Sequence, residues 1–218
     1  MTSSGSNRTT SLGGLGLVLV AIVPLAAVIA RWFPDAGESL SVLSSAPSQL
    51  VVDLILLASC VILSFGYRGE PDIVGSSALG RVSFLVLGSA SVIQFGFFGL
   101  TRVLNLGGAP ETIWIGTSVE LLPIGAMAVA AIAVIRARVL GGFARWILLG
   151  VAAAQVVQLA LSSVQNASQA YYTAAVLYFA AVPLLLLLSA GVSFALEGRP
   201  AGIRQRLHAI DATWRATT

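Results

Sequence analysis

Apolar runs of about twenty residues recur along almost the whole of this 218-residue chain. Each run is long enough to cross a hydrocarbon layer of about 30 Å as an α-helix. Charged residues make up only 10% of the chain, against about a quarter of a soluble domain. We therefore expect an all-α fold, a polytopic membrane helix bundle over residues 12–196. Its six transmembrane helices are expected at residues 12–33, 49–67, 80–104, 112–136, 143–164 and 171–196.

The two ends of the chain lack such runs. Residues 1–11 are small and polar, and they bury too little apolar surface to offset the entropy of ordering. We expect them to form a disordered tail. Residues 197–218 are basic and place four apolar side chains on one helical face, namely Ile203, Leu207, Ile210 and Trp214. This spacing favours an amphipathic helix on the membrane surface, and a frayed basic tail is the alternative.

The basic residues predict the orientation, because loops that stay in the cytoplasm retain Arg and Lys. All twelve are Arg. Only Arg31 and Arg102 fall on one side of the expected bundle, and the other ten fall on the opposite side, at positions 8, 68, 81, 136, 138, 145, 199, 204, 206 and 215. We expect both termini inside (N-in/C-in), in the cell inner (cytoplasmic) membrane. The first apolar run exceeds the 7–15 residues of a signal peptide core, so we expect that helix to be retained.

The chain has too few histidine and cysteine residues for several kinds of chemistry. The single histidine, His208, lies in the C-terminal tail, and the single cysteine, Cys60, lies inside an apolar run. An intramolecular disulfide, a Cys or His metal site within the bilayer and a Ser-His hydrolase are therefore excluded. Phosphate-loop and dinucleotide motifs are absent. We expect no cofactor and no nucleic-acid partner, and an enzyme is the less favoured class.

Polar residues inside the expected spans gather in the outer half of the bundle. An Asp or Arg near the middle of a spanning helix costs about 2.5–3.5 kcal/mol on insertion scales, so such residues usually face the bundle interior or a wet cavity. The candidate binding residues are Asp53, Gln94, Arg102, Glu120, Gln155, Gln158 and Tyr178. They predict a polar pocket that opens to the exterior. Hydration of Asp53 near the interface and snorkelling of Arg102 are the alternatives.

Glu120 is the deepest charge in the expected bundle, and at that depth it needs a partner such as Arg102, a Gln or a proton. Prolines within three expected helices each leave a carbonyl four residues earlier without its donor: Pro24 frees Val20, Pro123 frees Val119, and Pro183 frees Phe179. Free carbonyls beside a carboxylate are typical of cation sites in broken transporter helices. Kinks that serve packing are the alternative.

Two further patterns concern packing. Small residues in the third and fifth expected helices predict close helix contacts at Gly88, Ala90, Gly96, Gly99, Gly150 and Ala154. Residues 22–28 and 121–127 align around a proline, as two inverted halves of three helices each would require.

Three functions are compatible with these patterns. The leading hypothesis is a small-solute or ion transport-type protein whose outward-facing pocket uses Glu120. The second is a non-catalytic membrane subunit or accessory protein of a larger complex, with the bilayer, a second copy or a membrane-complex partner around it. The third is an intramembrane lipid-modifying enzyme, in which Glu120 or Asp53 acts as acid or base and Arg102 holds a phosphate.

Overall fold

The chain folds into six α-helices in a computed structural model, which describes residues 8–30, 45–67, 70, 72–75, 77–105, 110–141, 144–162 and 169–197. The helices are α1 (Arg8–Ala30), α3 (Ala46–Phe65), α4 (Ala78–Val103), α5 (Pro110–Ala137), α6 (Ala144–Ser162) and α7 (Gln169–Glu197). They confirm the all-α fold and all six helices expected from the sequence. The predicted tails at residues 1–7 and 198–218 lie outside the described residues.

Four of the helices are long and apolar enough to cross a membrane: residues 8–28 of α1, all of α3 and α4, and residues 115–137 of α5. The apolar stretches described in α6 and α7, residues 144–160 and 181–197, are shorter. The protein is therefore a membrane protein with an all-helical fold.

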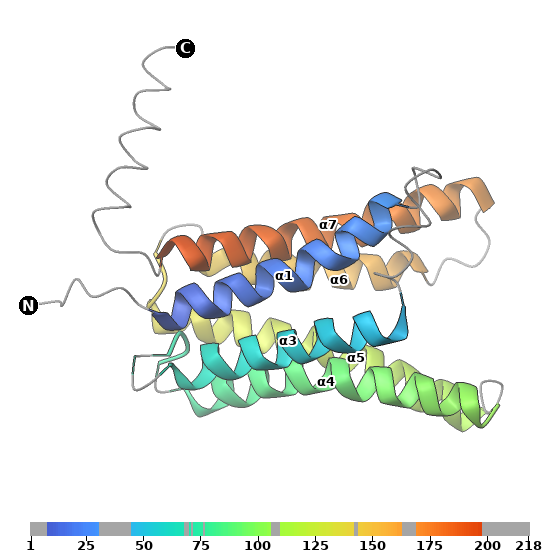
Figure 1. Cartoon of the computed structure of the whole chain (residues 1–218), viewed down its shortest axis with the longest axis horizontal. Coiled ribbons are helices and arrows are strands. Elements are labelled where there is room, and N and C mark those ends of the chain that lie inside the picture. The colour runs from blue at the N-terminus through green and yellow to red at the C-terminus, as the bar shows by residue number, and fades with distance from the viewer. Residues whose placement is uncertain are drawn as a thin grey trace, which may run out of the picture.

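The six helices form a closed ring, in which each helix packs against the helices before and after it in the chain. The ring closes because α1 also packs against α7. In Figure 1, α1, α6 and α7 lie above α3, α4 and α5, and all six run along the long axis of the molecule. Since no further helix occupies the centre within the described residues, only side chains can fill the interior of the ring.

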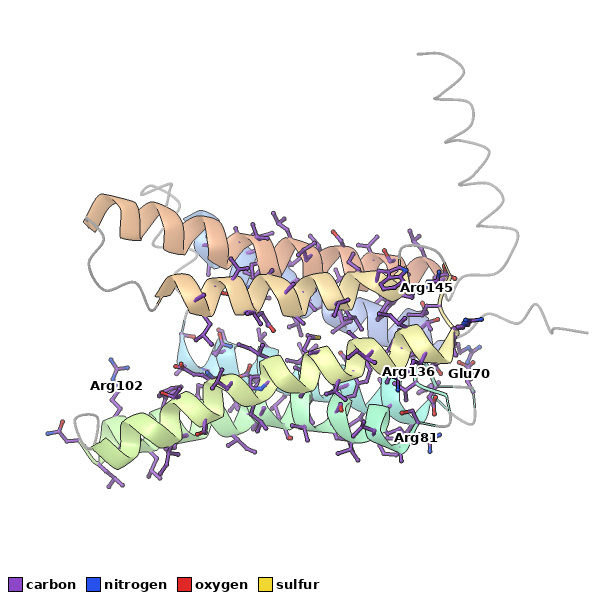
Figure 2. The ribbon with its side chains drawn as sticks, turned by 180° about the vertical axis from the view of Figure 1, so that it is seen from behind. Glu70, Arg81, Arg102, Arg136 and Arg145 are labelled. Carbon is purple, nitrogen blue, oxygen red and sulfur yellow. The ribbon has the colours of Figure 1, made fainter. Side chains whose placement is uncertain are left out.

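The ring has two distinct ends. One end, the Arg8 end, contains the start of α1 and the end of α7; the opposite end, the Val103 end, contains the end of α4. Figure 2 shows Glu70, Arg81, Arg136 and Arg145 at the Arg8 end, and Arg102 at the other.

Helix α1 begins at Arg8, within the segment expected to be a tail, because its first turn is hydrogen-bonded to the α3–α4 connection. The backbone N–H of Thr9 donates to a carboxylate oxygen of Glu70 at 2.7 Å, and the Thr9 hydroxyl donates to the same oxygen at 3.1 Å. The backbone N–H of Tyr67 donates to the Thr9 hydroxyl at 2.8 Å. These bonds satisfy a backbone donor that the first helical turn leaves without a partner.

The α3–α4 connection is itself held by an ion pair. Arg81 donates to Asp72 through both Nε and Nη2, at 3.1 and 2.7 Å, and through Nη2 to the carbonyl of Gly75. Asp72 is 8% exposed. The connection between α3 and α4 is therefore fixed both to α4 and to the first turn of α1.

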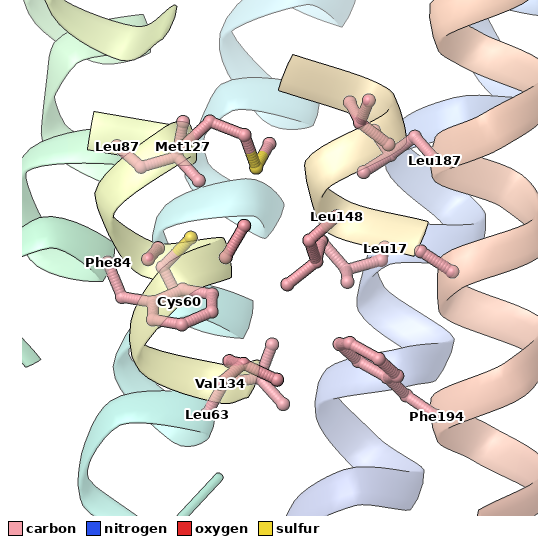
Figure 3. Close-up of a cluster of buried hydrophobic side chains, with 14 of the residues drawn as sticks. Leu17, Cys60, Leu63, Phe84, Leu87, Met127, Val134, Leu148, Leu187 and Phe194 are labelled. Carbon is pink, nitrogen blue, oxygen red and sulfur yellow. The ribbon is translucent and has the colours of Figure 1, made fainter. Parts of the chain in front are cut away.

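An apolar core fills the Arg8 half of the ring, and Figure 3 shows that all six helices contribute to it. Its buried side chains include Leu17, Cys60, Leu63, Phe84, Leu87, Met127, Val134, Leu148, Leu187 and Phe194. Each of these residues lies within about 16 Å of its helix terminus at the Arg8 end, at about 1.5 Å rise per residue. The Arg8 half of the ring is therefore packed with side chains.

Glycines allow the closest approach in the ring, between α1 and α7. A Cβ atom placed on Gly14 would lie 2.5 Å from the backbone nitrogen of Ala195 and 2.6 Å from the carbonyl oxygen of Gly191. A Cβ atom on Gly191 would lie 2.7 Å from the carbonyl oxygen of Gly14. Because these neighbours are backbone atoms that cannot move aside, the contact requires glycine on both helices.

The predicted role of small residues in α4 is confirmed at Gly88 and wrong at Gly96 and Gly99. A Cβ atom on Gly88 would lie 2.8 Å from Cα of Leu57, so α3 approaches closely there. The same atom on Gly96 or Gly99 would meet nothing within 4 Å. The reason is the face of α4 on which they lie: both glycines are exposed, and Gly99 lines the open half of the ring, so no neighbouring helix packs against them.

The circular order of the helices is incompatible with two inverted halves. A two-fold axis in the membrane plane would reverse the order of the helices around the ring. Two halves of three helices each would exchange every helix with the one three places further along the chain, and this exchange keeps the helices in the same order around the ring. The observed closed ring therefore excludes this symmetry, and the shared proline pattern reflects two independent helices.

We expect Gly14→Val to destabilise the bundle and Gly125→Val, the matched control, to leave it unchanged. A side chain at Gly14 would overlap the backbone of α7, whereas a Cβ atom on Gly125 has nothing within 4 Å. Forcing extra carbon atoms into a packed contact costs about 1–3 kcal/mol. The midpoint of thermal unfolding of the purified protein in detergent is the measurement. Equal midpoints for the two variants would show that the α1–α7 contact does not hold the ring closed.

Candidate ligand-binding cavity

A cavity of about 800 Å³ occupies the half of the ring that the core leaves open. Described residues of five helices line it, and this lining reaches the Val103 end. The lining residues are Val20 and Pro24 of α1; Ala46, Gln49, Val52 and Asp53 of α3; Ser91, Gln94, Phe95, Phe98, Gly99, Arg102 and Val103 of α4; Gln155 of α6; and Leu184 of α7. Its volume is in the range of small-molecule sites.

Asp53 is the acidic residue of this lining, and it is only 7% exposed. Helical spacing places Gln49 one turn before it, and the Gln49 amide donates to the Asp53 carboxylate at 3.2 Å. No cation neutralises it within the described residues, where the single ion pair is Arg81–Asp72 at the other end of α4. The carboxylate therefore has a neutral donor and no counter-charge.

Asp53 and Arg102 line the same cavity at different depths. Gly88 of α4 lies against Leu57 of α3, and these helices run in opposite directions. Asp53, four residues from Leu57, therefore lies level with α4 close to Ser91. Arg102 is about 15 Å further toward the Val103 end, at about 1.5 Å per residue. This separation places Arg102 at the mouth and does not favour an enzyme in which the two side chains act on one phosphate ester.

Gln155 adds an acceptor near the depth of Asp53. Its Oε1 atom is buried and accepts no hydrogen bond from the described residues. It lies about 17 Å along α6 from Ala144, and Asp53 lies about 18 Å along α3 from Phe65, both measured from the Arg8 end. A buried acceptor without a donor costs about 1–3 kcal/mol, so a donor brought in by a ligand would recover free energy there.

The proline of α1 contributes a third acceptor at this level. Pro24 has no N–H, so the helical hydrogen bond to the carbonyl of Val20 is lost, and both residues line the cavity. Val20 lies about 18 Å along α1 from Arg8. Because α1 begins at Arg8, four residues earlier than expected from the sequence, this carbonyl lies at the depth of Asp53.

The structure brings four of the seven predicted binding residues into one lining, Asp53, Gln94, Arg102 and Gln155. Sequence reasoning missed Gln49 and Ser91. Gln49 stands four residues before Asp53, and that helical spacing is the signal that identifies it. Tyr178 lies in α7, but its side chain is outside the described set.

Glu120 and Gln158 are exposed and do not line the cavity. The carboxylate of Glu120 has no partner among the described residues. The reason is its face of α5: Ala126 and Ala130 point into the core, whereas Glu120 shares the exposed surface with Leu121 and Leu122. A binding role for Glu120 and Gln158 therefore stays a prediction.

No protein-family model, no curated protein and no solved structure matches this chain. Within the described residues, no group of three or more His, Cys, Asp or Glu side chains could hold a metal ion. The function is therefore argued from the residues of the cavity themselves.

We expect a cysteine in place of Ser91 to react with a membrane-impermeant maleimide, because Ser91 lines the cavity. The native Cys60 is 0% exposed and should stay unlabelled. Adding Gly99→Trp should block the reaction by filling the cavity, whereas Gly96→Trp, one turn away and outside the lining, should not. Labelling is read as a mass shift of the intact protein. Equal labelling with both tryptophans would contradict a water-filled cavity at this position.

Proposed function

We propose that this chain is a small-solute or ion transport-type protein of the cell inner membrane, with six spans, both termini inside and the cavity as its outward-facing binding chamber. The observation that carries the proposal is the nearly buried Asp53 carboxylate, which lines a cavity extending to one end of the ring. An ionisable side chain in this position is costly to retain in a membrane protein without a function.

The distribution of arginine supports the orientation. Of the described arginines, five lie at the Arg8 end, at positions 8, 81, 136, 138 and 145, and Arg102 lies at the other. Cytoplasmic segments carry the excess of basic residues. The cavity then opens to the exterior and the apolar core lies on the cytoplasmic side.

The apolar core supports a chamber with one closed side. Phe194, Leu63 and Val134 are 0% exposed between the cavity and the Arg8 end. A transport cycle needs a second state in which these side chains separate and the Val103 end closes, because alternating access moves helices around a fixed site.

We expect Ser91→Cys to be labelled from both sides of the membrane if the chain transports a solute. The test compares an impermeant maleimide added to spheroplasts with the same reagent added to inverted membrane vesicles. Labelling from both sides requires the apolar core to open during a cycle. Labelling from the outer side alone would identify a binding chamber without transport and overturn the proposal.

A second candidate, a subunit of a larger membrane assembly, is favoured by the exposed Glu120. A charged side chain at the centre of a span costs about 2.5–3.5 kcal/mol against lipid. Glu120, five residues into the apolar span 115–137, bears part of this cost and has no partner among the described residues. Contact with a second copy or another membrane protein would provide one. This candidate is compatible with transport, because assembly and the cavity use different surfaces of the ring.

We expect Glu120→Leu to weaken such an assembly while leaving the chain folded. A polar contact between proteins is lost in the variant, whereas a lipid-facing leucine is favourable. Native mass spectrometry of protein extracted gently from its own membrane gives the stoichiometry. If the wild-type protein is monomeric and the Glu120→Leu variant is more stable than the wild type, Glu120 faces lipid.

A further inference from the structure

Three acceptors line the cavity at a similar depth, at its floor, where the apolar core ends. Asp53 supplies a carboxylate from α3, Gln155 an unpaired amide oxygen from α6, and Val20 a carbonyl freed by Pro24 on α1. Their distances from the Arg8 end agree within about 2 Å on the helical rise. Three helices therefore present oxygen acceptors, with one formal negative charge, at one level.

We infer that this floor binds a small organic cation with N–H donors, a primary ammonium ion. The inference rests on the proposed function, since it names the class of solute that the chamber takes. An ammonium group donates up to three hydrogen bonds, and its positive charge would neutralise the carboxylate of Asp53, which has no counter-charge among the described residues. The lining offers three acceptors at this depth, a carboxylate, an amide oxygen and a backbone carbonyl, as many as the ammonium group has donors.

The rest of the lining distinguishes an organic cation from a metal ion. Coordination by oxygen ligands at about 2–2.6 Å needs a compact cage, and a cavity of about 800 Å³ is much larger than one. Above the floor the walls are mainly apolar, with Phe95 and Phe98 among them, and Leu184 lies at the level of the floor. Such walls accommodate a hydrocarbon body, and aromatic faces also attract cations.

Arg102 does not compete for the same carboxylate. It lies about 15 Å from the level of Asp53, at the mouth of the cavity, where its side chain is exposed. Water screens its charge there, and a long side chain at a helix end reaches the headgroup layer. The carboxylate at the floor is therefore available to a ligand.

The test is equilibrium binding to the full-length protein in detergent, measured by isothermal titration calorimetry. Butylammonium is the probe, and butanol, butyrate and tetramethylammonium are the comparison ligands. We expect saturable binding of butylammonium, weaker binding of tetramethylammonium, which has no N–H, and none of butanol or butyrate. Binding of butanol or butyrate as tight as that of butylammonium, or no saturable binding of butylammonium, would overturn the inference.

Three variants assign the binding to the floor. Asp53→Asn removes the charge and keeps the shape, and we expect affinity to fall by about tenfold or more. Gln155→Leu should weaken binding by about three- to tenfold, and the control Ala153→Leu, on the exposed face of the same helix and outside the lining, should bind as the wild type does. Unfolding midpoints equal to that of the wild type show that each variant is folded.

An Asp53→Glu variant retains the charge and should restore part of the affinity that is lost in Asp53→Asn. Unchanged affinity in a folded Asp53→Asn variant would overturn the inference.

The outcome is separable from that of the transport proposal. Two-sided labelling of Ser91→Cys without butylammonium binding would leave transport intact and show that the ligand class is wrong. Butylammonium binding that depends on Asp53, together with one-sided labelling, would leave the ligand class intact and show that transport is wrong.

Discussion

The glycine contact between α1 and α7 is the interaction on which the architecture depends. Two helices far apart in the chain approach so closely at Gly14 and Gly191 that each would clash with a Cβ atom on the other. Without this contact the six helices would form an open row, since all other strong contacts join neighbours in sequence. In lipid, helices gain little from burying apolar surface against one another, so dispersion forces at close contacts decide which helices associate.

A closed ring of six helices surrounds more space than its backbones occupy. Large side chains from all six helices fill it in the half that contains Phe194, Leu63 and Phe84. In the other half the described lining includes small or polar residues, with Ser91, Gly99 and Gln155 among them, beside the apolar Phe95 and Phe98. The cavity, with Asp53 in its described lining, lies beyond the point where large side chains from all six helices fill the interior.

The sequence predicted the six helices well because run length alone identifies a spanning helix in lipid. It also predicted that polar groups of different helices share one half of the bundle, and Asp53, Gln94 and Gln155 do meet there. It could not predict which way Glu120 faces. Helix α5 is apolar on nearly all sides, because lipid and protein interior both favour apolar side chains, so no periodic pattern marks its inner face. Depth along a helix follows from counting residues, whereas rotation about its axis follows from its neighbours.

The hydrogen bonds from Thr9 to Glu70 add to the free energy needed to open the Arg8 end of the ring. If the Arg8 end opens by moving α1 away from the α3–α4 connection, both bonds break. A hydrogen bond to a charged group contributes about 1.5 kcal/mol at the low end of its range, so the pair amounts to about 3 kcal/mol. That energy corresponds to about a hundredfold excess of the form in which the two hydrogen bonds are made. In the proposed transport cycle, the form with the Arg8 end closed would therefore be the more populated one, and a ligand that shifts the equilibrium would have to bind the form with that end open more tightly.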